Sequence, residues 1–286
     1  MPAAKIGVIG GTGLDEIEGM TDIETVDVNT PFGKPSDRFT IGNLGNTKVA
    51  FLRRHGRGHY LTPGEVPGRA NIYAFKSLGV EHIIAVCSCG SFKPELKPGD
   101  LIIPDQLVDR TRKRVTSFFK EGIVAHIQFA DPFCPATSKI LYESAKESGA
   151  KVHEGGIYVC MEGPAFSTRA ESRLYKSWGA DVIGMTALPE AQLAREAEIC
   201  YGVIACVTDY DSWHEAEEPV TIDMVLATMR RNIETAKQII KLSVTALSAE
   251  RTCQCAHALQ NAVVTAKDVI PVAQKEKLSL LIGKYL

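Results

Sequence analysis

The segment that decides the fold class runs from Lys5 to Leu14 and reads KIGVIGGTGL. An apolar run rich in β-branched residues leads there into glycines that flank Thr12. The pattern predicts a buried strand and a tight turn, whose backbone N–H groups and Thr12 hydroxyl favour an anion. Glu16 occupies the position where a dinucleotide-binding fingerprint needs glycine, and no Gly-Lys-Ser/Thr of a P-loop follows. A plain tight turn explains the segment equally well.

Similar apolar runs recur along the chain and alternate with stretches of helical period. Several are apolar at every position, which is typical of strands covered on both faces. The alternation predicts an α/β fold with a mixed, mostly parallel β-sheet flanked by helices. No change of composition divides the chain, so we expect residues 1–286 to form a single domain. The expected strands are residues 5–9, 48–52, 82–86, 101–103, 156–161, 181–185 and 202–208, and the expected helices are 65–78, 137–148, 168–178, 189–198 and 222–248.

Composition and charge exclude several classes of protein. The 286 residues are 45% hydrophobic and 23% charged, which is ordinary for a globular protein and excludes disorder as the main state. With 32 Lys and Arg against 34 Asp and Glu, the net charge of −2 argues against a surface that coats nucleic acid. No apolar run approaches the roughly 18 residues that span a bilayer. We therefore expect a cytoplasmic protein that binds neither nucleic acid nor membrane.

A basic loop, RRHGRGH, extends from Arg53 to His59 directly after an expected strand. Arginine forks match phosphate oxygens well, so phosphate binding is the favoured function of this loop. The spacing of His55 and His59 is that of a helical zinc pair, but two glycines intervene and no Glu follows His55. We expect no metal here, and a merely solvated basic loop remains the alternative.

Further expected strands end in small, polar or sulfur-containing residues, within AVCSCGS (85–91), MEGPAFS (161–167) and GMT (184–186). Ligands of open α/β sheets bind at the carboxyl ends of the strands, so these ends should meet at one site. Ser88 and Thr186 could donate hydrogen bonds to phosphate, Phe166 could stack on a flat ligand, and Met185 could form an adaptable apolar wall. Taken singly, a core Phe166 and the filling of space by small residues are the favoured alternatives.

Two carboxylates, Asp209 and Asp211, stand just past another buried strand in the segment VTDYD. A buried anion is costly unless it is paired or hydrogen-bonded. A carboxyl with a raised pKa at such a place could pass a proton to a leaving group. Aspartates that merely cap a helix or a turn are an equal alternative.

Together these segments resemble the methylthioadenosine phosphorylases of the purine nucleoside phosphorylase family. The resemblance extends from Lys5 to the expected helix at 222–248 and is weaker beyond it. It implies the nucleoside phosphorylase fold, a homotrimer or a dimer of trimers, and no metal or organic cofactor, with inorganic phosphate as co-substrate. The motifs that carry it are GGTGLD (10–15), TPFGKPSD (30–37), RHGR (54–57), DPFCP (131–135), EGP (162–164) with RAES (169–172), MT (185–186) with PE (189–190), and TDYD (208–211) with Trp213.

The implied reaction is the phosphate-dependent cleavage of 5′-methylthioadenosine to adenine and 5-methylthioribose 1-phosphate, with adenosine use left open. The resemblance makes Asp209 the candidate proton donor to the purine and His55 a catalytic residue that holds the phosphate nucleophile. The implied phosphate site is Thr12, Arg54, His55, Ser88 and Thr186, and the implied nucleoside contacts are Cys87, Phe166, Met185, Asp209, Asp211, Ile222, Val225 and, from a neighbouring subunit, His126. Cys87 stands where much of the family has Thr.

The sequence leaves three alternative functions to consider. The first is a purine nucleoside or methylthioinosine phosphorylase that acts on 6-oxopurine nucleosides. Asp209 argues against it, because a carboxylate accepts from a 6-amino group whereas Asn suits a 6-oxo group. The others are a nucleotide-binding regulatory module without turnover and a dinucleotide-dependent dehydrogenase.

The eight cysteines are too few for a secreted disulfide scaffold, and most lie in apolar segments typical of buried thiols. The stretch Cys253-Gln254-Cys255 resembles the archaeal-type branch of the family, in which such cysteines can be oxidised. This resemblance suggests bridges between Cys200 or Cys206 and Cys253 or Cys255. Reduced thiols are an equal alternative.

Overall fold

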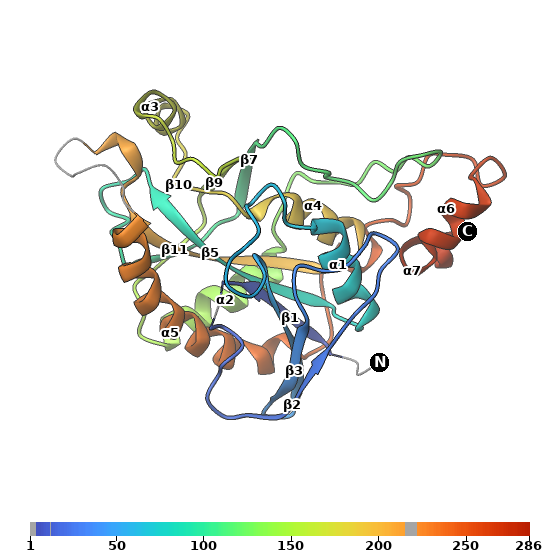
Figure 1. The fold of residues 1–286 in the computed structure, drawn as a ribbon, viewed down its shortest axis with the longest axis horizontal. Helices are drawn as coiled ribbons and strands as arrows, with labels where there is room; N and C mark the ends of the chain where they lie inside the picture. The colour runs from blue at the N-terminus through green and yellow to red at the C-terminus, as the bar shows by residue number, and fades with distance from the viewer. Residues whose placement is uncertain (1–3, 12, 215–221) are drawn as a thin grey trace.

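The computed structural model describes residues 4–11, 13–214 and 222–286. Within them, eleven strands form one sheet in the order β2-β3-β4-β1-β5-β10-β9-β7, while β11 pairs with β5 and β6, and β8 pairs with β6. Helices cover both faces of this sheet (Figure 1). The strands are β1 (Ile6–Gly10), β2 (Met20–Val26), β3 (Phe39–Leu44), β4 (Thr47–Arg53), β5 (His82–Ser91), β6 (Leu101–Ile103), β7 (Gln106–Arg110), β8 (Val152–Glu154), β9 (Ile157–Met161), β10 (Val182–Gly184) and β11 (Cys200–Asp209).

The centre of the sheet is parallel, as the unbroken apolar runs predict. Strand β1 pairs in parallel with both β4 and β5, and β11 runs parallel to β5 over most of its length. Every residue of β1 and β11 is buried. Antiparallel pairs occur between β2, β3 and β4, and between β10 and β5. The predicted mixed, mostly parallel sheet is therefore confirmed.

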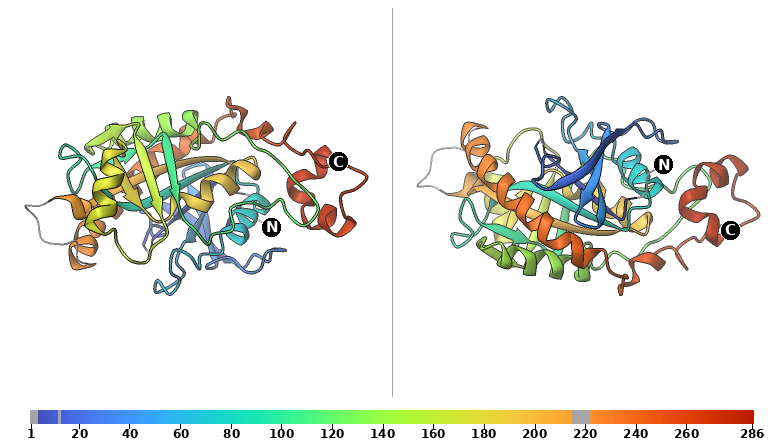
Figure 2. Two further views of the ribbon diagram at one scale, coloured as in Figure 1. Left: turned by 90° about the horizontal axis from the view of Figure 1, so that it is seen from above. Right: turned by 90° about the horizontal axis from the view of Figure 1, so that it is seen from below.

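The helices and the core form two layers, one on each face of the sheet. On one face α2 packs against α5, and both pack on β11; the apolar cluster there includes Leu141, Ile240 and Ile204 (Figure 2). On the other face α1 packs against α4. The α-helices are α1 (Gly68–Ser77), α2 (Pro135–Glu147), α3 (Arg169–Ser177), α4 (Ala187–Glu196), α5 (Ile222–Leu247), α6 (Val272–Lys277) and α7 (Ser279–Ile282). None of the helices in the described part of the chain is both long and apolar enough to cross a membrane.

The expected helices all exist, and the largest shift of a start is that of the first. The helix expected from residue 65 begins at Gly68, because Pro67 lies at its N-cap and a turn precedes it. Thr168 begins α3 with a capping box, in which its side chain accepts from the Glu171 backbone and Glu171 reaches back to Thr168. Strands β2, β3, β7 and β8 were not expected.

The chain after α5 forms an arm that ends in α6 and α7, at the right of Figure 1. It lies against the long loop that follows β7. The Val124 N–H donates to the Thr265 hydroxyl at 2.8 Å, and the His126 N–H donates to the Ala262 carbonyl at 2.8 Å. These bonds hold the arm and the loop together as one unit.

Candidate active site

A pocket of about 320 Å³ lies where the strand ends converge. This volume falls in the range of about 300–1,000 Å³ that is typical of small-molecule sites. The carboxyl ends of β1, β4, β5, β9 and β11 contribute to it, together with the residues after β10 and part of α5. Its lining includes Gly11, Arg54, His55, His59, Val86, Cys87, Ser88, Cys89, Gly90, Met161, Pro164, Phe166, Ile183, Gly184, Met185, Thr186, Cys206, Thr208, Asp209, Asp211, Asn232 and Ile233.

At one end of the pocket, Arg54 follows β4 with its guanidinium almost completely buried. Its Nε and Nη2 atoms lie 2.6 and 3.1 Å from the two carboxylate oxygens of Glu190, and Nη1 donates to the Val86 carbonyl at 2.9 Å. Nη2 also donates to the Ile9 carbonyl at 3.3 Å. Burial opposes the charge, but the attraction of Glu190 outweighs it and holds the pKa of Arg54 well above its usual value. Arg54 is therefore a fixed positive charge in the wall, with four of its five N–H donors already engaged.

His55 lies next to this charge and is a neutral imidazole at pH 7. Burial lowers its pKa to about 4, and the nearby Arg54 adds to the effect. Its Nδ1 atom lies 2.9 Å from the Leu61 carbonyl, and its ring stacks on that of His59 with centroids 4.3 Å apart. A carbonyl only accepts hydrogen bonds, so Nδ1 carries the proton and Nε2 is the acceptor in this neutral form.

The polar groups at the ends of β5 and β10 lie at the same end of the pocket. The Thr186 hydroxyl donates to the Cys87 sulfur at 3.0 Å, and Ser88 also lines the cavity. Burial raises the pKa of the Cys87 thiol, so this side chain is neutral at pH 7. Arg54, His55, Ser88 and Thr186 thus line one pocket. Thr12 lies outside the described residues.

The other end of the pocket holds the two carboxylates at the end of β11. The strand register shifts between Val207 and Asp209, and Asp211 adopts a left-handed φ of 46°. This bend directs the Asp211 N–H to Asp209 Oδ1 at 2.9 Å, and the Thr208 hydroxyl lies 2.7 Å from Asp209 Oδ2. Burial raises the pKa of Asp211, although Ser172, Ser167 and the Ser212 N–H oppose the shift. This end of the pocket is therefore lined by two neighbouring, buried carboxyl groups.

The walls between the two ends are largely apolar. Phe166 lines the cavity and is 45% exposed, so it is not the core residue that its position in the sequence also allowed. Met185 faces the same space, and a Cβ added to Gly163 would lie 2.5 Å from its sulfur. Gly163 has a left-handed φ of 68°, a conformation that glycine adopts without strain. The wall suits a flat ring and a sugar better than a charged ligand.

Three predicted nucleoside contacts are not placed in this cavity. His126 is exposed on the loop after β7 and does not line the pocket of its own chain. Ile222 and Val225 belong to α5, but their side chains lie outside the described part of the structure. Their roles stay predictions.

Two buried charges that support the site carried no assigned role in the sequence analysis. Glu190 holds Arg54 and also accepts from the Tyr201 hydroxyl at 2.8 Å. Arg114 donates to the carbonyls of Met185, Leu188, Met161 and Glu162, and so joins the loops after β9 and β10. Glu190 could have been found from the sequence, because a charged residue within an apolar segment such as TALPEA indicates a buried charge. Arg114 lies in a polar stretch, so its sequence context gives no such indication.

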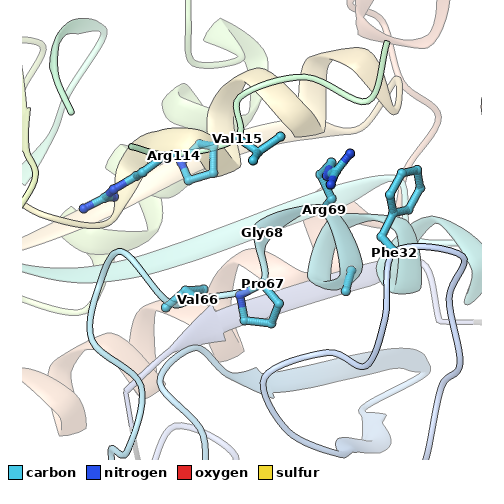
Figure 3. Close-up of a pocket in the computed structure, with 9 residues that line it drawn as sticks. Phe32, Val66, Pro67, Gly68, Arg69, Arg114 and Val115 are labelled. Atoms are coloured by element: carbon cyan, nitrogen blue, oxygen red, sulfur yellow. The ribbon is translucent and has the colours of Figure 1, made fainter. Parts of the chain in front are cut away.

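A smaller pocket of about 150 Å³ lies between the start of α1 and the segment that carries Arg114 and Val115 (Figure 3). Arg69 and Phe32 lie together at one side of it, with the guanidinium carbon 4.9 Å from the ring centre. Its volume is below the range typical of small-molecule sites. The larger cavity is therefore the candidate active site.

Comparison with known proteins agrees with this geometry. The model of a family described as the phosphorylase superfamily matches residues 5–245. The chain belongs to this superfamily. An S-methyl-5′-thioadenosine phosphorylase of Geobacter sulfurreducens is 56% identical over 282 residues, which cover 98% of this chain and 99% of that relative. The enzyme of the same name from Koribacter versatilis is 54% identical, with 99% and 97% covered.

Solved structures of such phosphorylases have the same fold. A methylthioadenosine phosphorylase from an antarctic soil metagenomic library has a TM-score of 0.94 and 45% identity, with 98% of this chain and 99% of that chain covered. The methylthioadenosine phosphorylase of Schistosoma mansoni in complex with adenine has a TM-score of 0.86 and 37% identity, with 93% and 99% covered. The predicted nucleoside phosphorylase fold is therefore confirmed.

Proposed function

We propose that this chain cleaves S-methyl-5′-thioadenosine with inorganic phosphate and releases adenine and 5-methylthioribose 1-phosphate. The observation that carries the proposal is that one cavity has two chemically different ends. The neutral His55 and the charged Arg54 lie at one end, and the Asp209–Asp211 pair lies at the other. Relatives of that name match nearly the whole chain, and a Schistosoma mansoni homologue is solved with methylthioadenosine. These relatives favour the adenine nucleoside over the 6-oxopurine alternative.

The phosphate end supplies the nucleophile. Ser88, Thr186 and, by resemblance, Thr12 donate hydrogen bonds to phosphate, while Arg54 supplies positive charge without giving up its bonds to Glu190. His55 Nε2 accepts a hydrogen bond from a protonated phosphate oxygen, because Nδ1 carries the proton of the ring. One phosphate oxygen then bonds to C1′ as the bond from C1′ to the purine breaks, and its negative charge stabilises the oxocarbenium-like sugar.

The base end supplies the proton. The purine leaves as a neutral molecule only if a proton reaches it as its bond to the sugar breaks. Asp209 is the proposed donor to the N7 side of the base, and it is recharged by the proton that phosphate loses. Its carboxylate also accepts from the 6-amino group, which selects adenine. Phe166 and Met185 hold the base and the ribose between the two ends.

The assay that tests this function measures purine release with and without phosphate from methylthioadenosine, adenosine, inosine and methylthioinosine. We expect phosphate-dependent release of adenine and little reaction with the 6-oxopurine nucleosides. Rapid release from inosine or methylthioinosine would overturn the assigned role of Asp209. Release that needs no phosphate would overturn the role of the Arg54–His55 end.

We further propose a homotrimer in which His126 of one subunit completes the 5′ end of the pocket in its neighbour. The exposed position of His126, outside the cavity of its own chain, supports this arrangement. The test mixes inactive His126→Ala and Asp209→Asn chains after dissociation and reassembly, and we expect a fraction of the activity to return. In the same proposal residues 1–286 form one functional domain that acts in the cytoplasm with phosphate as co-substrate and no organic cofactor.

A further inference from the structure

Four cysteine sulfurs converge at the end of β11 that lies opposite the active site. They belong to Cys134 at the N-cap of α2, Cys200 at the first residue of β11, and Cys253 and Cys255 in the arm. We refer to these four residues as the cysteine cluster. Asp209 ends the same strand, nine residues along, so the cluster lies about 30 Å from the base end of the pocket at ~3.3 Å per residue.

Hydrogen bonds bring three distant segments of the chain together here. The Cys134 N–H donates to the Tyr201 carbonyl at 2.8 Å, which ties the start of α2 to β11. Arg251 donates to the Glu198 carbonyl at 2.9 Å, and a Glu198 carboxylate oxygen accepts from the Leu259 N–H at 3.2 Å. The cluster therefore lies in a frame of hydrogen bonds between the sheet and the arm.

The four sulfurs lie close enough together to bind one metal ion. All four Sγ atoms lie within 4.8 Å of one another, with Cys200 and Cys253 at 3.2 Å, and three of the residues are buried. Zinc–sulfur bonds of ~2.3 Å place the sulfurs of a tetrahedral site about 3.8 Å apart, so movements of an ångström or less would suffice. A single disulfide would account for only two of these four sulfurs.

The surroundings favour thiolates at this point. Cys134 lies at the N-terminal end of α2, where the backbone N–H groups favour negative charge. Behind these residues, His82 Nδ1 lies 3.0 Å from the Thr137 hydroxyl and keeps that side chain in place.

We propose that the cysteine cluster binds one Zn²⁺ ion as a closed tetrathiolate that fastens the arm to the start of β11. A pure thiolate set selects soft or borderline metals, and four protein ligands leave no position for substrate, so the role is structural. Binding releases the thiol protons to solvent and leaves every cysteine in the same oxidation state. This site lies apart from His55 and His59, where we expect no metal, and it goes beyond the family resemblance, which implies none.

The test uses the full-length protein, fully reduced, loaded with zinc chloride and freed of excess metal by gel filtration. We expect one zinc per chain by elemental analysis. A matched sample loaded with cobalt chloride should show the intense visible absorption of tetrahedral cobalt and the charge-transfer bands of thiolate ligands. A chain that retains no zinc, or cobalt with an octahedral spectrum, would overturn the proposal.

Two variants separate the cluster from the other cysteines. The double variant Cys134→Ser/Cys255→Ser should lose the bound metal, whereas Cys160→Ser, which removes a buried thiol elsewhere, should retain it. Equal zinc content in both variants would contradict the assignment. If the double variant fails to fold, the cobalt spectrum of the wild type decides alone.

A final experiment shows whether the cysteines of the isolated protein bind zinc, form disulfides or are simply reduced. The protein is isolated without reductant and unfolded in the presence of a chelator, and its free thiols are counted. Eight free thiols together with one zinc support the metal site. Six or four free thiols and no zinc would overturn it in favour of disulfides. Eight free thiols that never retain zinc would overturn it in favour of simple reduced cysteines.

Discussion

Strand β11 carries a cysteine near each of its ends, and the two lie in opposite surroundings. Cys206 lines the nucleoside pocket, where burial raises its pKa to about 12. Cys200 begins the strand and faces three other sulfurs and the N-terminal end of α2. Cys206 is therefore a small neutral residue in the wall of the pocket, whereas Cys200 belongs to a group of four cysteines that could bind a cation together. The comparison teaches that neighbours, more than residue type, decide what a buried cysteine does.

The contrast between the two ends of β11 requires that a charged group of the pocket, Asp209, takes part in the reaction. We expect Asp209→Asn to lower kcat/KM for methylthioadenosine by about 100- to 10,000-fold, the usual range for loss of a general acid. We also expect the preference for adenine over hypoxanthine nucleosides to fall, because an amide no longer selects the 6-amino group. Steady-state assays on both nucleosides measure these effects. Asp268→Asn, at an exposed carboxylate outside the pocket, is the control, and an unchanged preference in the Asp209 variant would contradict the assignment.

The second prediction concerns stability at the opposite end of β11. A ligand present at 1,000 times its Kd stabilises a fold by about 4 kcal/mol, and at about 2–4 °C per kcal/mol the Tm should fall by roughly 10 °C when the metal is lost. We expect this fall for Cys134→Ser/Cys255→Ser in zinc-containing buffer, while kcat at 25 °C changes little. Thermal unfolding and initial rates measure the two quantities. An equal fall for Cys160→Ser would show that any lost thiol has this effect.

The third prediction separates two buried groups by the sign of their pH dependence. His55 has a folded-state pKa of about 4, so between that value and its ordinary 6.5 the unfolded chain binds more protons. Stability is then lost as the pH falls through this window. We expect the free energy of unfolding to fall by ~1–2 kcal/mol more from pH 7 to pH 5 in the wild type than in His55→Gln. Urea unfolding at both pH values measures it, and parallel curves would contradict the neutral state of His55.

Glu196 should behave in the opposite way. Burial raises its folded-state pKa to about 7, against hydrogen bonds from the Phe118 N–H and the Ser117 hydroxyl. Between its ordinary 4.5 and 7 the folded chain binds more protons, so stability is lost as the pH rises. Glu196→Gln should therefore gain stability relative to the wild type, by about 1–2 kcal/mol, on going from pH 5 to pH 7. The same relative stability at both pH values would show that Glu196 titrates normally.

The smallest expected effect tests the neutral pocket thiol. Cys87→Ser puts a stronger hydrogen-bonding group beside Thr186, and the gain of one such bond is about 0.5–1 kcal/mol. We expect the KM for methylthioadenosine to change by only a few-fold and kcat to be nearly constant. A loss of activity as large as that of Asp209→Asn would show that the Cys87 sulfur takes part in the reaction itself.

The sequence was most informative where the chemistry is local. Apolar runs predicted the central strands β1, β4, β5 and β11, because a strand covered on both faces needs apolar residues at every position. The edge strand β2 was missed because most of its residues are exposed, so it lacks that pattern. The polar strand ends predicted most of the pocket lining, because parallel strands present their carboxyl ends at one edge.

By itself, the sequence determined the class of fold, the polar groups at the strand ends and the family, since each is written in short segments. Only the tertiary structure decided that Glu190 forms an ion pair with the guanidinium of Arg54, although 136 residues separate them. It alone brought Cys134 and Cys200 to the cysteines of the arm. The physical reason is that periodicity and spacing record which face of an element a side chain occupies. Which faces meet is decided by the packing of the whole sheet and its two layers of helices.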